Sequence, residues 1–450
     1  FWQTAKHRGL DLAAPDDPFT WTTALEGVKG DNREWTVAAS ALRWFCKAKA
    51  IEKPNIVAHC FDQKTEVLTP TGWQRQDKIE VGDPILTYNR LGDYSEFEPV
   101  TAVHRYEDLK TMISCRGKMV DLMVTPEHGM WAGMNTTLPG DRHHTIWREV
   151  SMARLLDRVS KSWFVIRTAA RQVEKEISIT DSWLRLLAWI MAEGNIQVKN
   201  DRINWIRLAQ SDAPDGRLKT LRRDIEACGI QCFPTKKYNG EATTHGTYRN
   251  WDAYNLGLKN PSMYGPIVQR YFGLDKTPSD ILWSLSGRQA EIFLERYIMA
   301  DGSKTWNHSY QISAKRKDHI DFLQSLVTRL GYRSHIHERP PRFGRIGIVW
   351  CLSFSVNHNT AMVSMKKGNV RVVPYDGVSW CVTVPNGTVL VRRNGCTAIT
   401  LNSHGGQLPL LATEHGLEID TLVTVATPVR DDVLGHLVGR RIHRWVHIHT

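Results

Sequence analysis

The feature that most constrains this chain is a strand that stops at a cysteine, Cys60. The preceding residues, NIVAH at 55–59, follow a proline and have the apolar run of a buried β-strand. A helical pattern of apolar residues comes before them, so this flank predicts half of an α/β unit. The other flank, residues 403–450, predicts a turn, a helix and further strands. Neither flank, of 59 and 48 residues, is long enough to build a good core alone.

Joined directly, the two flanks read NIVAHSHGGQLPLL. This sequence resembles the nucleophile elbow of the α/β-hydrolases, a strand–[G/A]xSxG–helix motif that Ala58, Ser403 and Gly405 would fill. The resemblance implies that Ser403 is a hydrolase nucleophile, that the amide of His404 serves an oxyanion hole, and that the substrate is a small ester. The alternative is a glycine-rich turn of any α/β protein.

Charge separates the middle of the chain from both flanks. The flanks together carry twelve basic and twelve acidic residues, so the net charge of +11 lies within residues 60–402. A basic segment between neutral flanks indicates a polyanionic partner, and the alternative is that basic charge only aids solubility. The eight cysteines are scattered, which favours free thiols in a reducing, cytoplasmic compartment. No apolar run is long enough for a transmembrane helix, so no membrane partner is expected.

Three motifs of this middle segment resemble those of a known family. The segment begins with CFDQKTEVLTPTGW at Cys60, contains VTPEHGMW with Thr125 and His128, and ends with SWCVTVPNGTVLVRRNGCTAITLN, which Ser403 follows. A leading cysteine, a TxxH block and a terminal Asn-Ser junction resemble the blocks of an intein, the self-excising segment of the Hedgehog/intein family. The resemblance implies an all-β, horseshoe-shaped splicing (Hint) fold that brings both ends of the segment together. It implies no cofactor for splicing.

The resemblance also implies a role for each residue at the first junction. The Cys60 thiol would attack the carbonyl of His59 and convert the peptide bond into a thioester. His128, with Thr125, would polarise that bond and protonate its leaving nitrogen. Ser403 would then take over the acyl group as a branched ester.

At the second junction, the side-chain amide of Asn402 would cyclise to a succinimide and cut the chain before Ser403. Two positions depart from the usual pattern of the family. Leu401 stands where a histidine commonly assists cyclisation, and Leu401 cannot form a hydrogen bond through its side chain. Cys381 stands where many relatives carry aspartate. We interpret Cys381 as a thiol that tunes the ester and cyclisation steps, and the alternative is a buried structural cysteine.

Within the middle segment, LRLLAWIMAEGN (184–195) and IFLERYIMADGS (292–303) are two copies of one pattern. Each is an apolar helix that ends in a small residue, an acid and a glycine, and the acids are Glu193 and Asp301. The pair resembles the LAGLIDADG homing endonucleases, in which two such helices pack along a pseudo-two-fold axis. The resemblance implies a second enzyme inside the first.

In that family the paired acids bind divalent metal at the cleaved phosphates, so Glu193 and Asp301 are the implied metal ligands. Two carboxylates suit Mg²⁺ or Mn²⁺, and the implied partner is double-stranded DNA at a homing site in the host gene. Lys315 is a candidate for a basic helper beside the metal. The alternative for each acid-Gly helix end is an ordinary helix cap.

These resemblances together predict a multidomain, monomeric precursor. The predicted domains are an α/β-hydrolase part (1–59), a splicing part (60–178), an α/β LAGLIDADG endonuclease (179–350), a second splicing part (351–402) and a second hydrolase part (403–450). The hydrolase acid and histidine are not placed, and the triad histidine is expected beyond Thr450. Unplaced candidates are Asp431, Asp432, His443, His447 and His449. The alternatives are a splicing-defective remnant that only binds or cleaves DNA, a free-standing homing endonuclease, and a nucleic-acid-binding module without chemistry.

Overall fold

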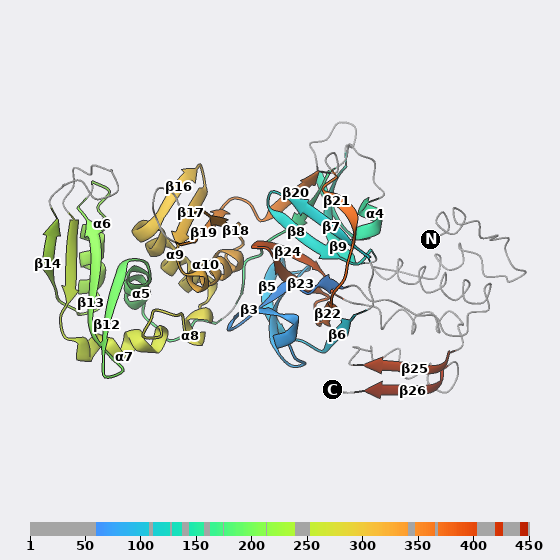
Figure 1. The fold of residues 1–450 in the computed structure, drawn as a ribbon, viewed down its shortest axis with the longest axis horizontal. Helices are drawn as coiled ribbons and strands as arrows, with labels where there is room; N and C mark the ends of the chain where they lie inside the picture. The colour runs from blue at the N-terminus through green and yellow to red at the C-terminus, as the bar shows by residue number, and fades with distance from the viewer. Residues whose placement is uncertain are drawn as a thin grey trace, which may run out of the picture.

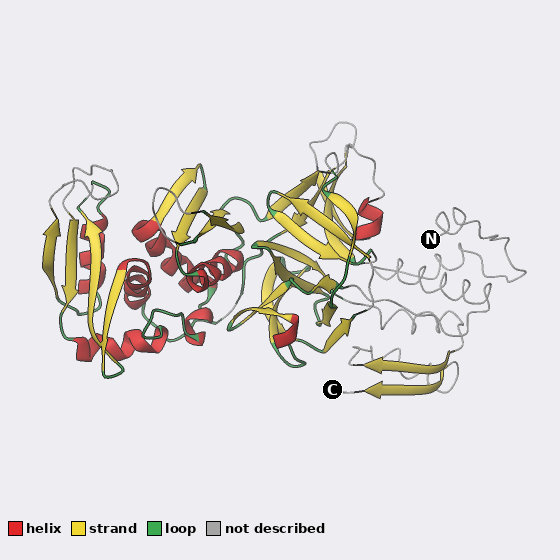
Figure 2. Ribbon diagram, in the orientation of Figure 1, coloured by secondary structure: helices red, strands yellow, loops and turns green. Residues whose placement is uncertain are grey.

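The computed structural model describes residues 60–402, except 108–110, 127, 137–143, 157–162, 174, 213, 239–252, 341–346 and 365–367, and the backbone of strands at 419–425 and 442–448. The predicted hydrolase flank 1–59, Ser403 and His404 therefore lie outside the described residues. Figure 1 shows two parts of unlike composition between residues 60 and 402. One part consists mostly of strands, and in the other part helices alternate with sheets (Figure 2).

The first part, called the β-rich region below, comprises residues 60–167 and 360–402. Its elements are β1 (Phe61–Asp62), β2 (Glu66–Thr69), β3 (Gly72–Arg75), η1 (Gln76–Lys78), β4 (Pro84–Asn89), β5 (Tyr94–Pro99), β6 (Ala102–Tyr106), β7 (Thr111–Gly117), β8 (Val120–Val124), β9 (Gly129–Thr136), β10 (His144–Ser151), α4 (Met152–Leu156), β11 (Trp163–Arg167), β20 (Thr360–Ser364), β21 (Val370–Pro374), β22 (Ser379–Thr383), β23 (Thr388–Arg393) and β24 (Cys396–Leu401). β8 alternates buried and half-buried residues, as expected for a strand with one covered face. β22 and β23 are buried throughout, which indicates strands covered on both faces.

The two ends of the β-rich region meet in one six-stranded sheet, in the order β21-β7-β8-β1-β22-β6. β1 pairs with β8 through Phe61 and Val124, and with β22 through Phe61 and Trp380. Strand pairing therefore places Cys60, which precedes β1, beside Cys381, 321 positions later in the sequence.

The second part, called the repeat region below, spans residues 181–355 and contains one arrangement twice. The first copy consists of α5 (Asp181–Glu193), β12 (Gly194–Lys199), β13 (Arg202–Ser211), α6 (Arg217–Glu226), β14 (Cys232–Tyr238) and β15 (Ala253–Leu258). The second copy consists of α9 (Gly287–Asp301), β16 (Gly302–Trp306), β17 (Ser309–Ala314), α10 (Lys317–Arg329), β18 (Arg333–Arg339) and β19 (Val349–Ser355). Between them lie α7 (Pro261–Tyr271) and α8 (Asp280–Trp283). The sheet orders β12-β13-β15-β14 and β16-β17-β19-β18 are equivalent, so the repeat of sequence is also a repeat of topology.

The central helices of the repeat region, α5 and α9, begin at side chains that cap their first turns. The Thr180 hydroxyl accepts a hydrogen bond from the Trp183 amide at 3.4 Å. Ser286 and Gln289 form a reciprocal capping box at the start of α9. Both helices bury apolar residues in one large core that also contains residues from both sheets.

The second sheet of the repeat region continues into the β-rich region. β18 contacts β24 through the pair His335 and Cys396, which gives the eight-stranded order β16-β17-β19-β18-β24-β23-β2-β3. β19 pairs along its length with β17 and β18. The domain boundary predicted at residue 351 falls inside this strand, so strand pairing moves the end of the repeat region to Ser355.

Of the C-terminal flank, the structure describes β25 (Ile419–Val425) and β26 (Ile442–Ile448), which pair in parallel. Parallel neighbours require a crossover connection and are typical of α/β proteins. Among the described residues, no helix is both long and apolar enough to cross a membrane.

Burial of one histidine predicts how stability depends on pH. His319 on α10 is buried, and its Nε2 is hydrogen-bonded to the Lys276 carbonyl at 2.9 Å. Burial lowers the pKa of His319 from 6.5 to about 4. Between these values the unfolded chain binds more protons than the folded chain, so stability falls as pH drops from 6.5 towards 4. We expect His319→Gln, which stays neutral and still donates to the carbonyl, to remove up to about 3 kcal/mol of this loss.

The measurement is the difference in Tm between pH 7 and pH 4.5, which should be smaller in His319→Gln than in the parent chain. The matched control is His358→Gln at an exposed histidine, which should behave like the parent. An equal decrease in Tm between pH 7 and pH 4.5 in both variants would show that His319 does not control the pH dependence of stability.

Candidate functional site

Cys60 and Cys381 place two buried thiols side by side in the β-rich region. Their sulfur atoms lie 3.9 Å apart, and both side chains are fully buried. Thr125 holds the backbone of Cys60, because the Cys60 amide donates to Thr125 Oγ1 at 3.1 Å and the Thr125 amide donates to the Cys60 carbonyl at 3.0 Å. The structure thus brings three of the predicted residues together, and the Cys60 amide nitrogen belongs to the bond predicted to break first.

His128 contacts both ends of the segment 60–402. A tight turn joins it to Thr125, since the His128 amide donates to the Thr125 carbonyl at 3.1 Å. The ring of Phe61, next to Cys60, has its centroid 4.7 Å from the centroid of the imidazole. On its other side, His128 Nε2 is hydrogen-bonded to the hydroxyl of Thr400 on the last strand, β24.

Asn402 follows β24 and is held by the turn at residues 384–387. Its backbone amide donates to the Gly387 carbonyl at 3.1 Å, and its side-chain Nδ2 donates to the Val384 carbonyl at 3.1 Å. Its Oδ1 is buried and has no hydrogen-bond partner among the described residues. Gly387 has a φ of +67°, which glycine adopts without strain and which closes this turn. The turn therefore fixes the carboxamide nitrogen that is predicted to attack in cyclisation.

A buried ion pair ties the strands that carry these residues. Arg393 on β23 bonds Asp62 on β1 with a nitrogen–oxygen distance of 3.1 Å, and it also bonds Asp121. The Asp62 carbonyl accepts a hydrogen bond from Trp380 Nε1 at 3.0 Å. Asp62 lies two residues after Cys60, so this network connects the first strand to β8, β22 and β23.

Motif reasoning does not identify two further polar residues of this cluster. Thr400 is fully buried and lies two positions before Asn402, and this nearness in sequence to a predicted reacting residue is the signal that could have identified it. His104 on β6 lies opposite Cys381 in the β6–β22 pairing. Burial lowers the pKa of His104, which keeps its imidazole neutral at neutral pH. No local pattern marks His104, because only strand pairing brings it to Cys381.

The second candidate site lies where the two central helices of the repeat region end. Glu193 is the last residue of α5 and Asp301 the last residue of α9, and a glycine follows each acid. A Cβ atom on Gly194 or Gly302 would lie 2.3 or 2.7 Å from a carbonyl oxygen of the preceding turn. The φ angles of these glycines are −71° and −90°, so close approach rather than a left-handed cap requires glycine here.

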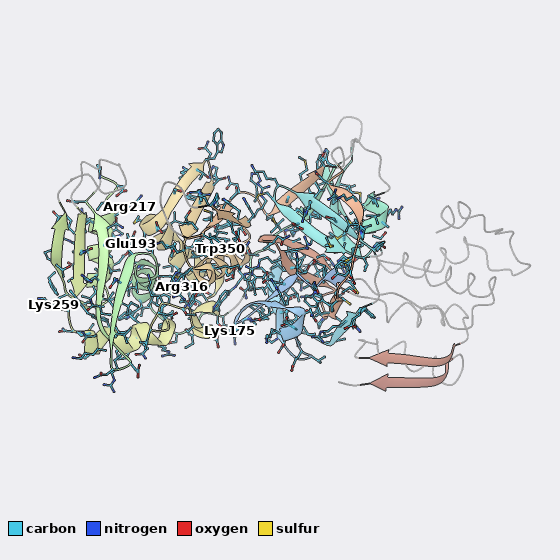
Figure 3. All side chains as sticks on the ribbon, viewed as in Figure 1. Lys175, Glu193, Arg217, Lys259, Arg316 and Trp350 are labelled. Atoms are coloured by element: carbon cyan, nitrogen blue, oxygen red, sulfur yellow. The ribbon has the colours of Figure 1, made fainter. Side chains whose placement is uncertain are left out.

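The two acids share basic neighbours. Desolvation raises the pKa of Asp301 to about 6, although Arg217 and Lys276 act to lower it. Burial and the charge of Arg316 lower the pKa of Lys276, whereas the charges of Glu193 and Asp301 raise it. Figure 3 labels Glu193 at the end of α5 and Arg217 at the start of α6. The site therefore combines two carboxylates with two cations.

The lysine that the structure places at the end of α5 is Lys276, and the predicted Lys315 lies elsewhere, after β17. Lys276 Nζ donates to the Met191 carbonyl in the last turn of α5 at 3.1 Å. Lys315 is exposed after the end of β17. In the part of the chain that the structure describes, the cations acting on Asp301 are Lys276 and Arg217. The loop between α7 and α8 folds back onto the helix end, a contact that no local spacing indicates.

The oxygen donors of Glu193 and Asp301 suit a hard divalent cation. Mg²⁺ is usually bound by one or two carboxylates, with water and substrate phosphate as the remaining ligands. Among the described residues, no cluster of three or more His, Cys, Asp or Glu side chains is placed to hold a metal. The donor set therefore fits an ion that is shared with a phosphate substrate better than a closed structural site.

The first sheet of the repeat region carries an aromatic and basic surface. β13 alternates between buried apolar residues and Trp205 and Arg207, which lie on the other face. Trp205 stacks on Phe233 with 6.5 Å between ring centroids, and the Arg207 guanidinium lies 5.0 Å from the Trp205 ring. Lys259 lies 6.0 Å from the Phe233 ring. Cations and flat apolar groups on one sheet face are the groups that proteins use to contact nucleic acid.

Comparison with known proteins gives one curated relative and several solved structures. The chain is 20% identical over 465 residues to the DNA-directed RNA polymerase subunit beta C-terminal section of Stigeoclonium helveticum. That match covers 84% of this chain, but the chain spans only 42% of the length of this relative.

Among solved structures, mesophilic variants from the homing endonuclease I-DmoI match at 18% identity, covering 39% of this chain and 89% of that chain with a TM-score of 0.28. The homing endonuclease I-WcaI bound to its DNA recognition sequence matches at 12% identity, covering 41% and 79% with a TM-score of 0.29. The N-terminal LAGLIDADG domain of DUF199/WhiA matches at 13% identity, covering 39% and 74% with a TM-score of 0.26.

A family model described as a LAGLIDADG-like domain matches residues 289–355. These residues run from the first turn of α9 to the end of β19 and include Asp301. The chain thus contains a LAGLIDADG-like domain, and the matched residues form the second copy of its repeat region.

Proposed function

We propose that residues 60–402 are a self-splicing segment that excises itself and joins the two flanks. The observation that supports this best is the convergence of both ends of the segment on one imidazole. His128 packs on Phe61, next to the first residue, and bonds Thr400, two residues before the last. Cys60 and Asn402, the residues with the required chemistry, are one residue before Phe61 and two residues after Thr400 in the sequence.

The proposed reaction begins when the Cys60 sulfur attacks the carbonyl carbon of residue 59. A carbon–sulfur bond forms, the peptide carbon–nitrogen bond breaks, and the thiol proton passes through His128 to the leaving amine. Thr125, which bonds the Cys60 amide, holds this nitrogen in place. The Ser403 hydroxyl then attacks the thioester, so that an ester forms and the Cys60 thiol is released.

The second cleavage uses Asn402. Its Nδ2, held by the Val384 carbonyl, attacks the Asn402 main-chain carbonyl and expels the amine of Ser403, which leaves a succinimide. That amine then displaces the ester oxygen, and a peptide bond joins residue 59 to Ser403. We further propose that the joined flanks form an ester hydrolase with Ser403 as nucleophile, which the parallel pairing of β25 and β26 supports.

The first test of splicing is the fate of the purified 51.4 kDa chain. Splicing converts it into an excised segment of about 39 kDa and a joined product of about 12 kDa, by residue proportion. We expect Cys60→Ala to abolish thiol-induced cleavage at the first junction, and Asn402→Ala to abolish cleavage at the second junction while sparing the first. Each loss should exceed about 100-fold, because a reacting atom is removed. Gels and intact mass measure both events.

The matched control is Cys232→Ala, which removes a thiol in the repeat region and should splice like the parent. A parent chain that stays intact with thiol present, or a Cys60→Ala chain that still cleaves before residue 60, would contradict the proposal.

We propose DNA cleavage as a second function, carried by the repeat region. Its support is the pair of acids at equivalent helix ends, with the charge of Lys276 acting on both. When bound, a divalent ion at Glu193 and Asp301 supplies an activated water and neutralises phosphate charge. The surface around Trp205 and Arg207 would hold double-stranded DNA, with the uninterrupted host gene as its target.

We expect Glu193→Gln and Asp301→Asn to lower Mg²⁺-dependent cleavage of this target by at least about 100-fold, because each removes a metal-binding oxygen charge. DNA binding, measured by gel shift, should remain, since the sheet surface is unchanged. Lys276→Met should slow cleavage about 10- to 100-fold through loss of a cation beside both acids.

Lys315→Met provides a control with the same loss of charge at an exposed position, and its cleavage rate should stay within about threefold of the parent. Cleavage that persists in both acid variants would eliminate this function, and equal losses in the two lysine variants would eliminate the role of Lys276.

A further inference from the structure

We propose that Thr400 is a positioning residue of the splicing reaction, because its hydroxyl fixes which nitrogen of His128 carries the proton. This inference rests on the proposed splicing function. It adds the hydrogen bond through which the two junctions are linked. It also assigns a role to a position next to Leu401, where the family pattern is broken.

The Thr400 hydroxyl lies among three polar atoms in a fully buried setting. Its Oγ1 is 3.0 Å from the Leu401 carbonyl oxygen and 3.4 Å from the Gly129 carbonyl oxygen. The third neighbour is Nε2 of His128, with which it forms a hydrogen bond. No charged group is among these contacts.

Counting protons assigns each of these bonds a direction. A carbonyl oxygen only accepts, and a hydroxyl has one proton to give. An uncompensated contact between two buried oxygens at 3.0 Å is unfavourable, so the Thr400 proton belongs to a carbonyl. Nε2 of His128 must then donate to Thr400, and the other ring nitrogen, Nδ1, carries the lone pair.

This assignment has a direct consequence for the first cleavage. The proton that leaves the Cys60 thiol must reach the amine nitrogen through a single basic site on His128. With Nε2 held as a donor, Nδ1 is the nitrogen that accepts that proton and releases it. Without the hydroxyl, the two tautomers of the ring would compete, and only one would present a basic Nδ1.

The same hydroxyl also acts on the second junction. Thr400 faces His128, whereas the Leu401 side chain lies on the other face of β24 by strand alternation. The bond from Thr400 to the Leu401 carbonyl fixes the peptide that leads into Asn402. Polar assistance near the second junction thus comes from residue 400, not from the side chain at residue 401, and it is shared with the histidine of the first junction.

The activity test compares Thr400→Val, which removes only the hydroxyl, with Thr400→Ser, which retains it. Both are made in the full chain with Asn402→Ala, so that thiol-induced cleavage at the first junction is measured alone between pH 6 and 9. We expect the valine variant to cleave roughly tenfold more slowly, with a displaced pH profile. The serine variant should keep the parent profile and a rate within about threefold. A valine variant with the parent rate and profile, or a serine variant as slow as valine, overturns the proposal.

A second measurement determines the tautomer of His128 in a chain that cannot cleave. In a chain with Cys60→Ala and Asn402→Ala, ¹⁵N shifts of the His128 ring, identified by their loss in His128→Gln, should show a protonated Nε2. Thr400→Val should shift these signals towards a mixture, and Thr400→Ser should not. A protonated Nδ1 in the parent overturns the assignment whether or not the chain splices. A protonated Nε2 in a parent that never cleaves overturns the splicing proposal and leaves the hydrogen-bond assignment standing.

Discussion

The register of strand β24 is the constraint on which the cluster around His128 depends. One edge of β24 pairs with β23 along its whole length, from Cys396 to Leu401. Its other edge meets β18, where Ile336 donates to the Gly395 carbonyl at 3.0 Å. Because side chains alternate along a strand, a slip of one residue would turn Thr400 away from His128. Pairing on two edges is therefore what places the last residues of the segment beside the first.

Arg392 links the β-rich region to the repeat region by ion pairs. Its guanidinium is 2% exposed, bonds Glu66 at 2.7 Å and Asp321 at 2.6 Å, and lies 4.4 Å from the Trp73 ring. Removing one partner of such a buried pair costs about 3–5 kcal/mol, because a charge is left uncompensated. Helix α10 supplies Asp321 and also His319, which holds the Lys276 carbonyl. One helix thus supports elements of both candidate sites.

Much of this organisation could be predicted from local pattern. The repeat of apolar helices ending in acid and glycine predicts two equivalent helix ends, and the structure has Glu193 and Asp301 there. Spacing within a motif also places Thr125 and His128 in one turn. The limit of the domain could not be predicted in this way. β19 crosses residue 351, and a strand belongs to the sheet that pairs with it, which composition does not reveal.

The sequence by itself determined the types and order of the candidate residues and the doubling of the repeat region, because these depend on chemistry and on short-range periodicity. Only the tertiary structure decided which other side chains lie beside these residues. Lys276 reaches the acids through a folded-back loop, His104 reaches Cys381 through strand pairing, and Thr400 reaches His128 across a core. These contacts join residues far apart in the chain, and their proximity is set by the packing of strands and helices, which local pattern does not encode.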